Sequence, residues 1–400
     1  MAAPLVVWDP ALLRYRWSDD HPMNPLRLEL TMLLATELGV LDGLDVIAPE
    51  PADDQTLRTV HTADYIAAVK AASVPGAGPY GDEDGFGLGT TDDPVFVGMH
   101  DAAALIAGGS VLAARSIATG EVTRAVNIAG GMHHAMAGRA SGFCVYNDAA
   151  LAIVELLGRG VERVAYVDVD VHHGDGVQAA FYDDPRVMTI SLHESPRTLF
   201  PGTGRPAEVG GGDAAGTSVN VALPAGTGDA GWLRAFHAVV PGALQAFRPQ
   251  VLVSQHGADA HVEDPLANLR LSVDGQRAAQ LALRELADRH SGGRWLAVGG
   301  GGYALVRVVP RTWTHLLGIV TDRDVAPATP LPPGFCRTAR AYVRDDGTPG
   351  GGLPLTMTDD APATYQPWDG HRETPVDEAV LATRTAVFPL LGLDPFDPRD

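Results

Sequence analysis

The chain has 400 residues, enough for one large domain or two domains of ordinary size. A formal net charge of −20 argues against binding nucleic acid through its phosphates and mildly favours a cationic substrate. Two cysteines exclude a disulfide framework, and the N-terminus lacks the basic region of a signal peptide. We therefore expect a cytoplasmic protein with no apolar run of membrane-spanning length and no membrane partner.

Strands and helices are predicted to alternate along the chain. Strands are expected in the apolar runs 5–8, 125–129, 164–171, 187–192, 219–223, 251–254 and 295–298. Helices are expected at 26–38, 62–72, 101–119, 149–157, 177–182, 228–247, 273–290 and 376–387. Continuous apolar strands are typical of a parallel sheet that is covered on both faces. The sequence therefore predicts an α/β fold with an open, mostly parallel central sheet and helices on both faces.

Residues 1–400 are expected to form a single domain. Residues from about 322 to 400 are predicted to wrap around it as a C-terminal extension, Pro/Gly-rich at 327–368, with a flexible bend at 350–352. The Gly-, Pro- and Asp-rich stretch 75–93 is expected to be a long loop, and loops of that length in compact domains are often functional.

The stretch 164–176, V-A-Y-V-D-V-D-V-H-H-G-D-G, begins as a buried strand and ends in carboxylates and histidines. On an extended strand, Asp168, Asp170 and His172 would project to one side. Two carboxylates on a buried face need a positive partner, and a divalent metal is the simplest one. Asp170 and His172 are therefore candidate ligands, with Asp259 as the third. Competing ligand candidates are His256, His261 and Asp264. The donor set fits Zn²⁺ or Fe²⁺.

Two adjacent histidines, His133 and His134, follow another strand and a Gly-Gly turn. Histidine titrates near neutrality, as general acid–base catalysis requires. Asp168 and Asp175 are available to orient the two rings. Tyr303 follows four glycines after the last predicted strand, and a phenol opposite a metal can donate to a developing oxyanion.

Other features have simpler structural explanations. Phe143 and Phe200 could line a narrow slot, although isolated aromatic residues usually belong to the core. The G-x-G-x-x-G sequence at 226–231 lacks the acidic residue that a dinucleotide site needs, so we interpret it as a strand-to-helix turn. No G-x-S-x-G nucleophile motif occurs, and Cys144 is expected to serve packing.

Together these residues resemble the histone deacetylase superfamily in its class I-like branch, and within it the bacterial acetoin-utilisation deacetylases. The likeness runs from about Trp8 to Thr321. The motifs that produce it, in the family's order, are H-P-M-N-P-L-R, G-G-M-H-H-A, G-F-C-V-Y-N-D, D-V-D-V-H-H-G-D-G, S-L-H, F-P-G-T-G, G-A-D and G-G-G-G-Y.

The resemblance implies an arginase/deacetylase-like fold and metal-dependent removal of acetyl groups from acetyl-lysine side chains of proteins or peptides, with release of acetate. It implies a metal on Asp170, His172 and Asp259, with His133 and His134 at the metal-bound water and Tyr303 on the carbonyl oxygen. The substrate-binding residues it implies are Asp92, Gly142, Phe143, Phe200 and Leu266. The neighbouring Asp93 leaves the assignment of Asp92 open.

The same resemblance places Arg27 at an acetate channel. It implies a monovalent cation, usually potassium, near Asp168, Asp170, His172, Ser191 and Leu192. Among its departures from the family pattern, Met132 replaces a bulkier residue and Leu199 replaces an aromatic one. His173 is expected to have a structural role and to point away from its neighbour.

Three alternatives to a protein deacetylase stay open. Polyamine-specific relatives carry an acidic residue where this chain has Leu266, which disfavours an acetylpolyamine amidohydrolase without excluding one. An acyl-lysine binding module without catalysis would not need the full set of catalytic residue types. A dinucleotide-binding protein would leave the Asp and His clusters unexplained. The sequence does not predict the oligomeric state.

Overall fold

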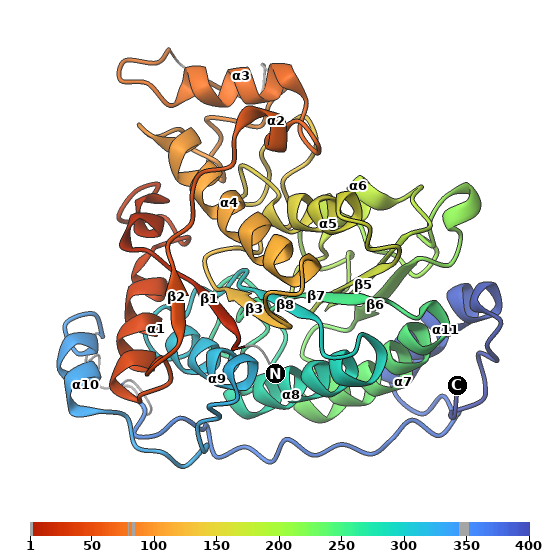
Figure 1. The fold of residues 1–400 in the computed structure, drawn as a ribbon. Coiled ribbons are helices and arrows are strands. Elements are labelled where there is room, and N and C mark those ends of the chain that lie inside the picture. The colour runs from red at the N-terminus through yellow and green to blue at the C-terminus, as the bar shows by residue number, and fades with distance from the viewer. Residues whose placement is uncertain (1–2, 79, 82–84, 344–351) are drawn as a thin grey trace.

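The computed structural model describes residues 3–78, 80–81, 85–343 and 352–400. Its centre is an eight-stranded sheet in the order β2-β1-β3-β8-β7-β4-β5-β6 (Figure 1). The strands are β1 (Leu5–Val7), β2 (Asp45–Ile47), β3 (Arg124–Asn127), β4 (Val164–Asp168), β5 (Val187–Glu194), β6 (Ser218–Leu223), β7 (Val251–Gln255) and β8 (Trp295–Val298). All neighbouring strands pair in parallel, so the predicted α/β class is confirmed.

Helices cover both faces of this sheet. They are α1 (Leu26–Glu37), α2 (Asp54–Leu57), α3 (Ala63–Ala72), α4 (Met99–Ala118), α5 (Asp148–Gly158), α6 (Asp175–Phe181), α7 (Asp229–Phe247), α8 (Val273–His290), α9 (Val309–Thr321), α10 (Pro333–Ala339) and α11 (Pro375–Val387). Short 3₁₀ helices lie at Pro10–Arg14, Gly212–Ala214 and Phe388–Leu391. Figure 1 shows α4, α5 and α6 on one side of the sheet and α7, α8 and α9 on the other.

Side chains of the central strands are buried in both directions. Val164 and Tyr166 pack in a cluster with residues of α4 and α5, whereas Ala165 and Val167 belong to the cluster that contains residues of α7, α8 and α9. Because strand residues alternate between the two faces, both faces need apolar residues, which produces the continuous apolar runs.

Several elements differ from the sequence-based expectation. The strand expected at 164–171 ends at Asp168, because the chain turns there and the Asp168 and Asp259 carboxylates accept the N–H groups of Asp170 and Val171. The sequence does not predict β2, α2, α9 or α10. The apolar residues of α9 recur at helical spacing, but its polar residues are buried as well, and β2 is a short exposed edge strand.

Helix α4 is long and apolar enough to cross a membrane by length and composition, contrary to the expectation that no run reaches such a length. In the fold, 72% of the most apolar 18-residue stretch of this helix is buried, and the helix packs against α5 and β3. It therefore serves as a core helix of the domain.

The segment after α9 runs along the outside of the fold. Figure 1 shows it passing from α10 along the helical layer to α11, which packs against α7 and β6. Asp359 anchors its middle: the carboxylate accepts from His261 Nε2 at 2.8 Å and from the Val273 N–H at 2.8 Å, and pairs with Arg311 at 2.7 Å. Of the expected bend at 350–352, residues 350–351 lie outside the described residues.

Candidate active site

Four adjacent strands deliver the candidate residues to one edge of the sheet. The chain leaves β3 towards His133 and His134, β4 towards Asp170 and His172, β7 towards Asp259, and β8 towards Tyr303. These strands are neighbours in the order β3-β8-β7-β4, and all of them point the same way. Residues far apart in sequence therefore meet beyond the carboxyl ends of the strands, where α/β folds place their sites.

Asp170, His172 and Asp259 form a compact buried cluster. Their potential ligand atoms all lie within 4.8 Å of one another. His172 Nδ1 lies 3.2 Å from Asp170 Oδ1 and 3.2 Å from Asp259 Oδ2. Burial and the neighbouring Asp170 raise the pKa of Asp259 to about 7. Burial also acts to raise the pKa of Asp170, but His133 and His172 outweigh it and hold that pKa well below its usual range.

This cluster fits a divalent cation better than it fits protons alone. A single proton on His172 Nδ1 would face two carboxylate oxygens at equal distance, and one N–H cannot point well at both. A cation at the same position would satisfy all three atoms. Two carboxylates, one imidazole and room for further ligands match a catalytic zinc or iron site.

Each of the adjacent histidines is paired with a buried carboxylate. His133 Nδ1 lies 2.8 Å from Asp168, and His134 Nδ1 lies 2.7 Å from Asp175. The two Nε2 atoms lie 3.0 Å apart. Although burial lowers it, Asp168 and Asp170 raise the pKa of His133 to about 9, whereas burial and His133 lower the pKa of His134.

The glycine run before Tyr303 lets the backbone approach the metal-ligand carboxylates. The Gly301 N–H donates to Asp170 Oδ2 at 2.9 Å, and a Cβ atom on Gly301 would lie 1.9 Å from Asp259 Oδ2. Tyr303 follows directly, with its own N–H donating to Asp264 at 2.8 Å. Burial and Asp259 raise the pKa of Tyr303 well above its usual range, so its hydroxyl stays protonated.

A pocket of about 200 Å³ opens onto these groups. The residues that line it are Asp92, His134, Gly142, Phe143, His172, Leu199, Phe200, Leu266 and Tyr303. Phe143 stands edge-on to Tyr303 and Phe200 edge-on to His134, with ring centroids 5.7 and 5.0 Å apart. Gly142 has φ +52°, and a Cβ there would lie 2.5 Å from the His134 ring, so only glycine fits.

The structure separates Asp92 from Asp93. Asp92 is exposed and lines the pocket, whereas Asp93 is 2% exposed and its Oδ1 has no hydrogen-bond partner among the residues that the structure describes. Burial, followed by the charge of Asp92, raises the pKa of Asp93 to about 8. Asp92 is therefore the aspartate available to a ligand at the mouth.

Arg27 lies behind the site and does not line the pocket. It is 2% exposed, donates to the Gly300 carbonyl at 2.6 Å and stacks over Trp313. Three of the monovalent-cation candidates lie on adjacent strands: Asp168 of β4 is in register with Ser191 of β5, and Leu192 is fully buried beside it, whereas Asp170 and His172 follow the end of β4.

The competing candidates do not join the metal-ligand cluster. His256 bonds to Ser254, His261 pairs with Asp359, and Asp264 accepts N–H groups of Leu266 and Tyr303. His173 turns to Thr203 and Gln178 instead of the cluster. As expected, residues 226–231 connect a strand to a helix: 226–228 lie between β6 and α7, and 229–231 are the first residues of α7.

Supporting residues that sequence reasoning missed hold the cluster in place. Gln255 donates to Asp170 Oδ2 at 2.7 Å, and Tyr166 donates to Asp168 Oδ2 at 2.7 Å. Buried Asp148 accepts the N–H groups of Gly131 and Met132, which lead into the two histidines. The sequence offers one signal for Asp148, an Asn-Asp pair at the start of a helix. Nothing in the sequence distinguishes Gln255 and Tyr166 from ordinary strand residues.

Comparisons with known proteins agree with this arrangement. Residues 21–320 match the family model described as the histone deacetylase domain. The chain is 43% identical over 335 residues to the acetoin utilization protein AcuC of Bacillus subtilis (strain 168), covering 83% of this chain and 85% of that protein. It is 38% identical over 355 residues to AcuC of Staphylococcus xylosus, covering 88% and 90%.

Solved structures agree as well. A crystal structure of an HDAC homolog from Aquifex aeolicus has a TM-score of 0.83 and 29% identity, covering 96% of this chain and 100% of that one. An HDAC homolog complexed with SAHA has a TM-score of 0.83, 30% identity and the same coverage. The chain therefore has the arginase/deacetylase-like fold and belongs to the histone deacetylase family, a family of hydrolases that act on amides.

Proposed function

We propose that the protein is a metal-dependent lysine deacetylase that hydrolyses the acetyl amide of acetyl-lysine side chains in proteins or peptides and releases acetate. The observation that supports this most is that His172 of the metal-ligand cluster, His134 of the histidine pair and Tyr303 line one aromatic-walled pocket. The walls suit the uncharged methylene chain of an acyl-lysine, and the polar groups suit its amide.

The metal, Zn²⁺ or Fe²⁺, would be held by Asp170, His172 and Asp259. When bound, it would polarise the amide carbonyl and lower the pKa of a water molecule. SAHA, with which the HDAC homolog above is complexed, should compete with substrate for the pocket. We also propose potassium beside Asp168 and Ser191, where two strands are in register.

The two histidines would divide the proton transfers. His134 has the lowered pKa and donates its Nδ1–H to the Asp175 carboxylate, so its Nε2 is the atom that can take a proton from water. His133 has the raised pKa and is held by Asp168, so it would stay protonated and deliver a proton to the leaving amine. Unequal pKa values in neighbouring titratable groups are the usual mark of such a division.

Tyr303 would stabilise the negative charge that develops on the carbonyl oxygen. Its raised pKa keeps the hydroxyl a donor throughout the working pH range. Arg27, which donates a hydrogen bond to the Gly300 carbonyl, carries a positive charge that would attract the acetate anion and favour its release through the interior.

An acetylpolyamine amidohydrolase is the second candidate, and the net charge of −20 favours it because polyamines are cations. Leu266 argues against it, because an apolar side chain lines the pocket where an acidic residue would recognise a second amine. The two candidates differ only in substrate and would share the same chemistry.

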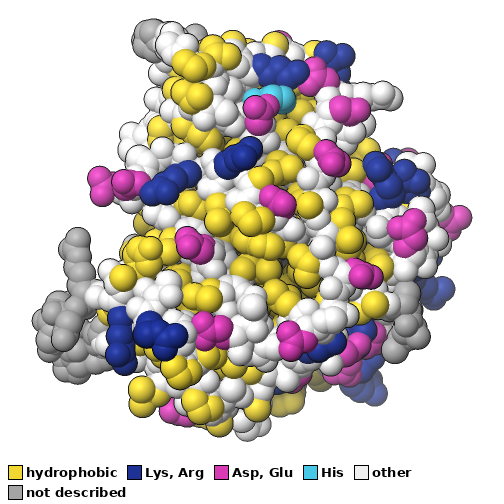
Figure 2. All heavy atoms as spheres, turned by 60° about the vertical axis from the view of Figure 1, so that its left-hand side comes forward, with side chains coloured by type: hydrophobic (Ala, Val, Ile, Leu, Met, Phe, Trp, Pro, Cys, Tyr) yellow, Lys and Arg dark blue, Asp and Glu magenta, His cyan; other side chains and the backbone are white. Residues whose placement is uncertain are grey.

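We propose a cytoplasmic setting without nucleic-acid binding. The cysteines Cys144 and Cys336 are both free. On the face drawn in Figure 2, Lys and Arg side chains are interspersed with Asp and Glu rather than gathered into one basic surface. The names of the relatives support a role in acetoin utilisation.

The test is a comparison of kcat/KM for an acetyl-lysine peptide and for N-acetylspermidine, with protein reconstituted with one defined metal. The proposal expects the peptide to be preferred. Preference for N-acetylspermidine would replace it with the second candidate, and no hydrolysis of either would refute both.

A further inference from the structure

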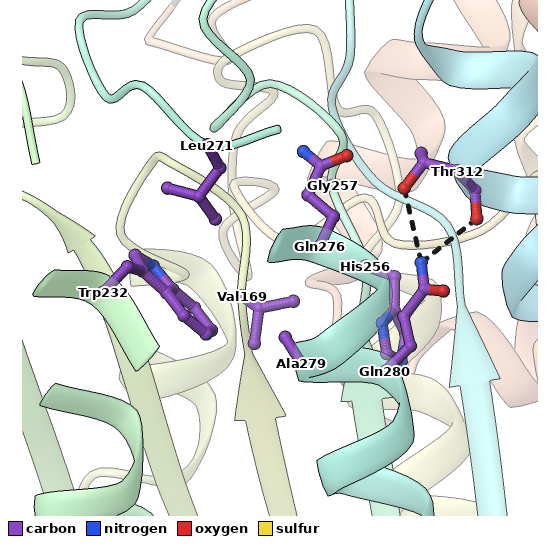
Figure 3. A pocket seen from close by; sticks show the side chains of 9 residues that line it. All are labelled: Val169, Trp232, His256, Gly257, Leu271, Gln276, Ala279, Gln280 and Thr312. Atoms are coloured by element: carbon purple, nitrogen blue, oxygen red, sulfur yellow. Dashed lines mark hydrogen bonds between the residues drawn. The ribbon is translucent and has the colours of Figure 1, made fainter. Parts of the chain in front are cut away.

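A small interior cavity lies behind the candidate metal ligands, between the ends of β4 and β7 and the helices α7 and α8. The residues that line it are Val169, Trp232, His256, Gly257, Leu271, Gln276, Ala279, Gln280 and Thr312. All of them are buried. Figure 3 shows Gln276, Ala279 and Gln280 reaching in from α8, His256 beside them, and Trp232 on the far side of Val169.

Four of these side chains carry a buried polar atom with no hydrogen-bond partner among the described residues. The atoms are Trp232 Nε1, His256 Nδ1, Gln276 Oε1 and Gln280 Oε1. Buried polar atoms are nearly always paired, because an unpaired one costs about 1–3 kcal/mol. Their gathering around one cavity therefore points to a ligand that pairs with them.

The hydrogen-bond chemistry of the four atoms can be assigned. Trp232 Nε1 carries a hydrogen and is a donor. Each glutamine uses its amide nitrogen elsewhere, Gln276 on the Ala258 carbonyl at 2.9 Å and Gln280 on Thr312 at 3.1 Å, so each Oε1 is an acceptor.

His256 is a donor at Nδ1. The Ser254 hydroxyl accepts from Trp295 Nε1, and in the described part of the chain the acceptor within its reach is His256 Nε2, at 2.7 Å. Ser254 therefore donates to Nε2, which leaves the hydrogen of this neutral ring on Nδ1. Burial lowers the pKa of His256 to about 3, so the ring stays neutral at any physiological pH.

We propose that this cavity is a binding site for one internal water molecule. Trp232 lies on the far side of Val169 from the other three (Figure 3), so His256 Nδ1 as donor and the two glutamine oxygens as acceptors are the partners within one group, and about three hydrogen bonds are what an internal water typically makes. The cavity leaves about 10 Å³ for the centre of a water molecule, which is about the space that one water needs. An anion would leave both glutamine oxygens unpaired. A cation would leave the histidine hydrogen unpaired, and no carboxylate lines the cavity to hold it.

The site also explains how the third candidate ligand is supported. His256 and Gly257 lead into Asp259, Val169 lies between Asp168 and Asp170, and Gln276 already holds the Ala258 carbonyl. Water that bridges His256 to a glutamine of α8 would join the Asp259 segment to that helix. This inference does not depend on the substrate or on the proposed reaction.

A crystal structure of the full chain at high resolution tests it directly. The expected result is one density peak in the cavity, within about 3.2 Å of the histidine donor and at least one of the two glutamine acceptors. An empty cavity would overturn the proposal, and so would a peak with the density or coordination of an ion.

A substitution on α8 gives a second test in solution. Ala279→Val adds two methyl groups at the cavity wall, whereas Ala287→Val adds them on the same helix at a buried position that does not line the cavity. Water-¹⁷O relaxation dispersion, which counts long-lived internal waters, should lose one water in Ala279→Val and none in Ala287→Val. Equal counts in both variants and the wild type would contradict the site, and if Ala279→Val does not fold, the crystal structure of the wild type decides.

Discussion

Removal of the Tyr303 hydroxyl should abolish most turnover while leaving the pocket intact. The ring stands edge-on to Phe143, and the Tyr303 N–H is fixed by Asp264; a phenylalanine keeps both contacts. Because the raised pKa keeps the phenol protonated, the wild type has this donor at every working pH. Loss of one oxyanion donor costs about 100- to 1000-fold in kcat, or about 2.7–4 kcal/mol.

The assay is acetate release from an acetyl-lysine peptide, with kcat and KM measured separately for Tyr303→Phe. KM and metal content should stay close to the wild type, since neither depends on the hydroxyl. Tyr342→Phe, which removes a hydroxyl from an exposed tyrosine, is the matched control. A fall in kcat of less than about threefold, or a loss confined to KM, would remove Tyr303 from the proposed mechanism.

Three further substitutions test other parts of the account. Asp93→Asn should stabilise the protein increasingly as pH rises from about 4 to 8, by roughly 1 kcal/mol of unfolding free energy per pH unit. The reason is that folded Asp93 retains a proton that the unfolded chain releases above its ordinary pKa of 3.8. The same difference in melting temperature between variant and wild type at pH 5 and pH 8 would contradict this. Asp359→Asn leaves buried Arg311 and His261 without their carboxylate and should cost about 3 kcal/mol of unfolding free energy in denaturant titrations, whereas an unchanged midpoint would show that the anchor contributes nothing. Leu266→Glu should lower the peptide-to-N-acetylspermidine ratio of kcat/KM by about tenfold, equivalent to about 1.4 kcal/mol, and an unchanged ratio would exclude Leu266 as the specificity determinant.

The parallel sheet could be predicted because its strands are buried on both faces, which leaves continuous apolar runs such as 164–167. Helix α9 is not predicted although its apolar residues recur at helical spacing; its Arg, Thr and His side chains are buried too, so the pattern marks no exposed face. Strand β2 has three exposed residues at the sheet edge, too few to produce a period.

Some residues of the candidate site could likewise be predicted from the sequence, whereas others could not. Asp170 and His172 stand two residues apart and form a local signal, but Asp259 lies 87 residues beyond His172, and only the parallel strand order brings it to them. The choice between Asp92 and Asp93 depends on which of the two side chains is buried, which neighbouring residues in a loop do not reveal. Gln255 supports Asp170 through a contact that exists only in the folded sheet.

Metal-dependent acetate release tests the central claim most directly. Full-length protein is stripped with a chelator, reconstituted with Zn²⁺ or Fe²⁺, and assayed on an acetyl-lysine peptide beside Asp259→Asn, which removes one charge from the candidate ligand cluster. We predict that stripping abolishes hydrolysis, that about one equivalent of metal restores it in the wild type, and that the variant recovers little. Hydrolysis that survives complete metal removal, or full activity in Asp259→Asn, would contradict the account.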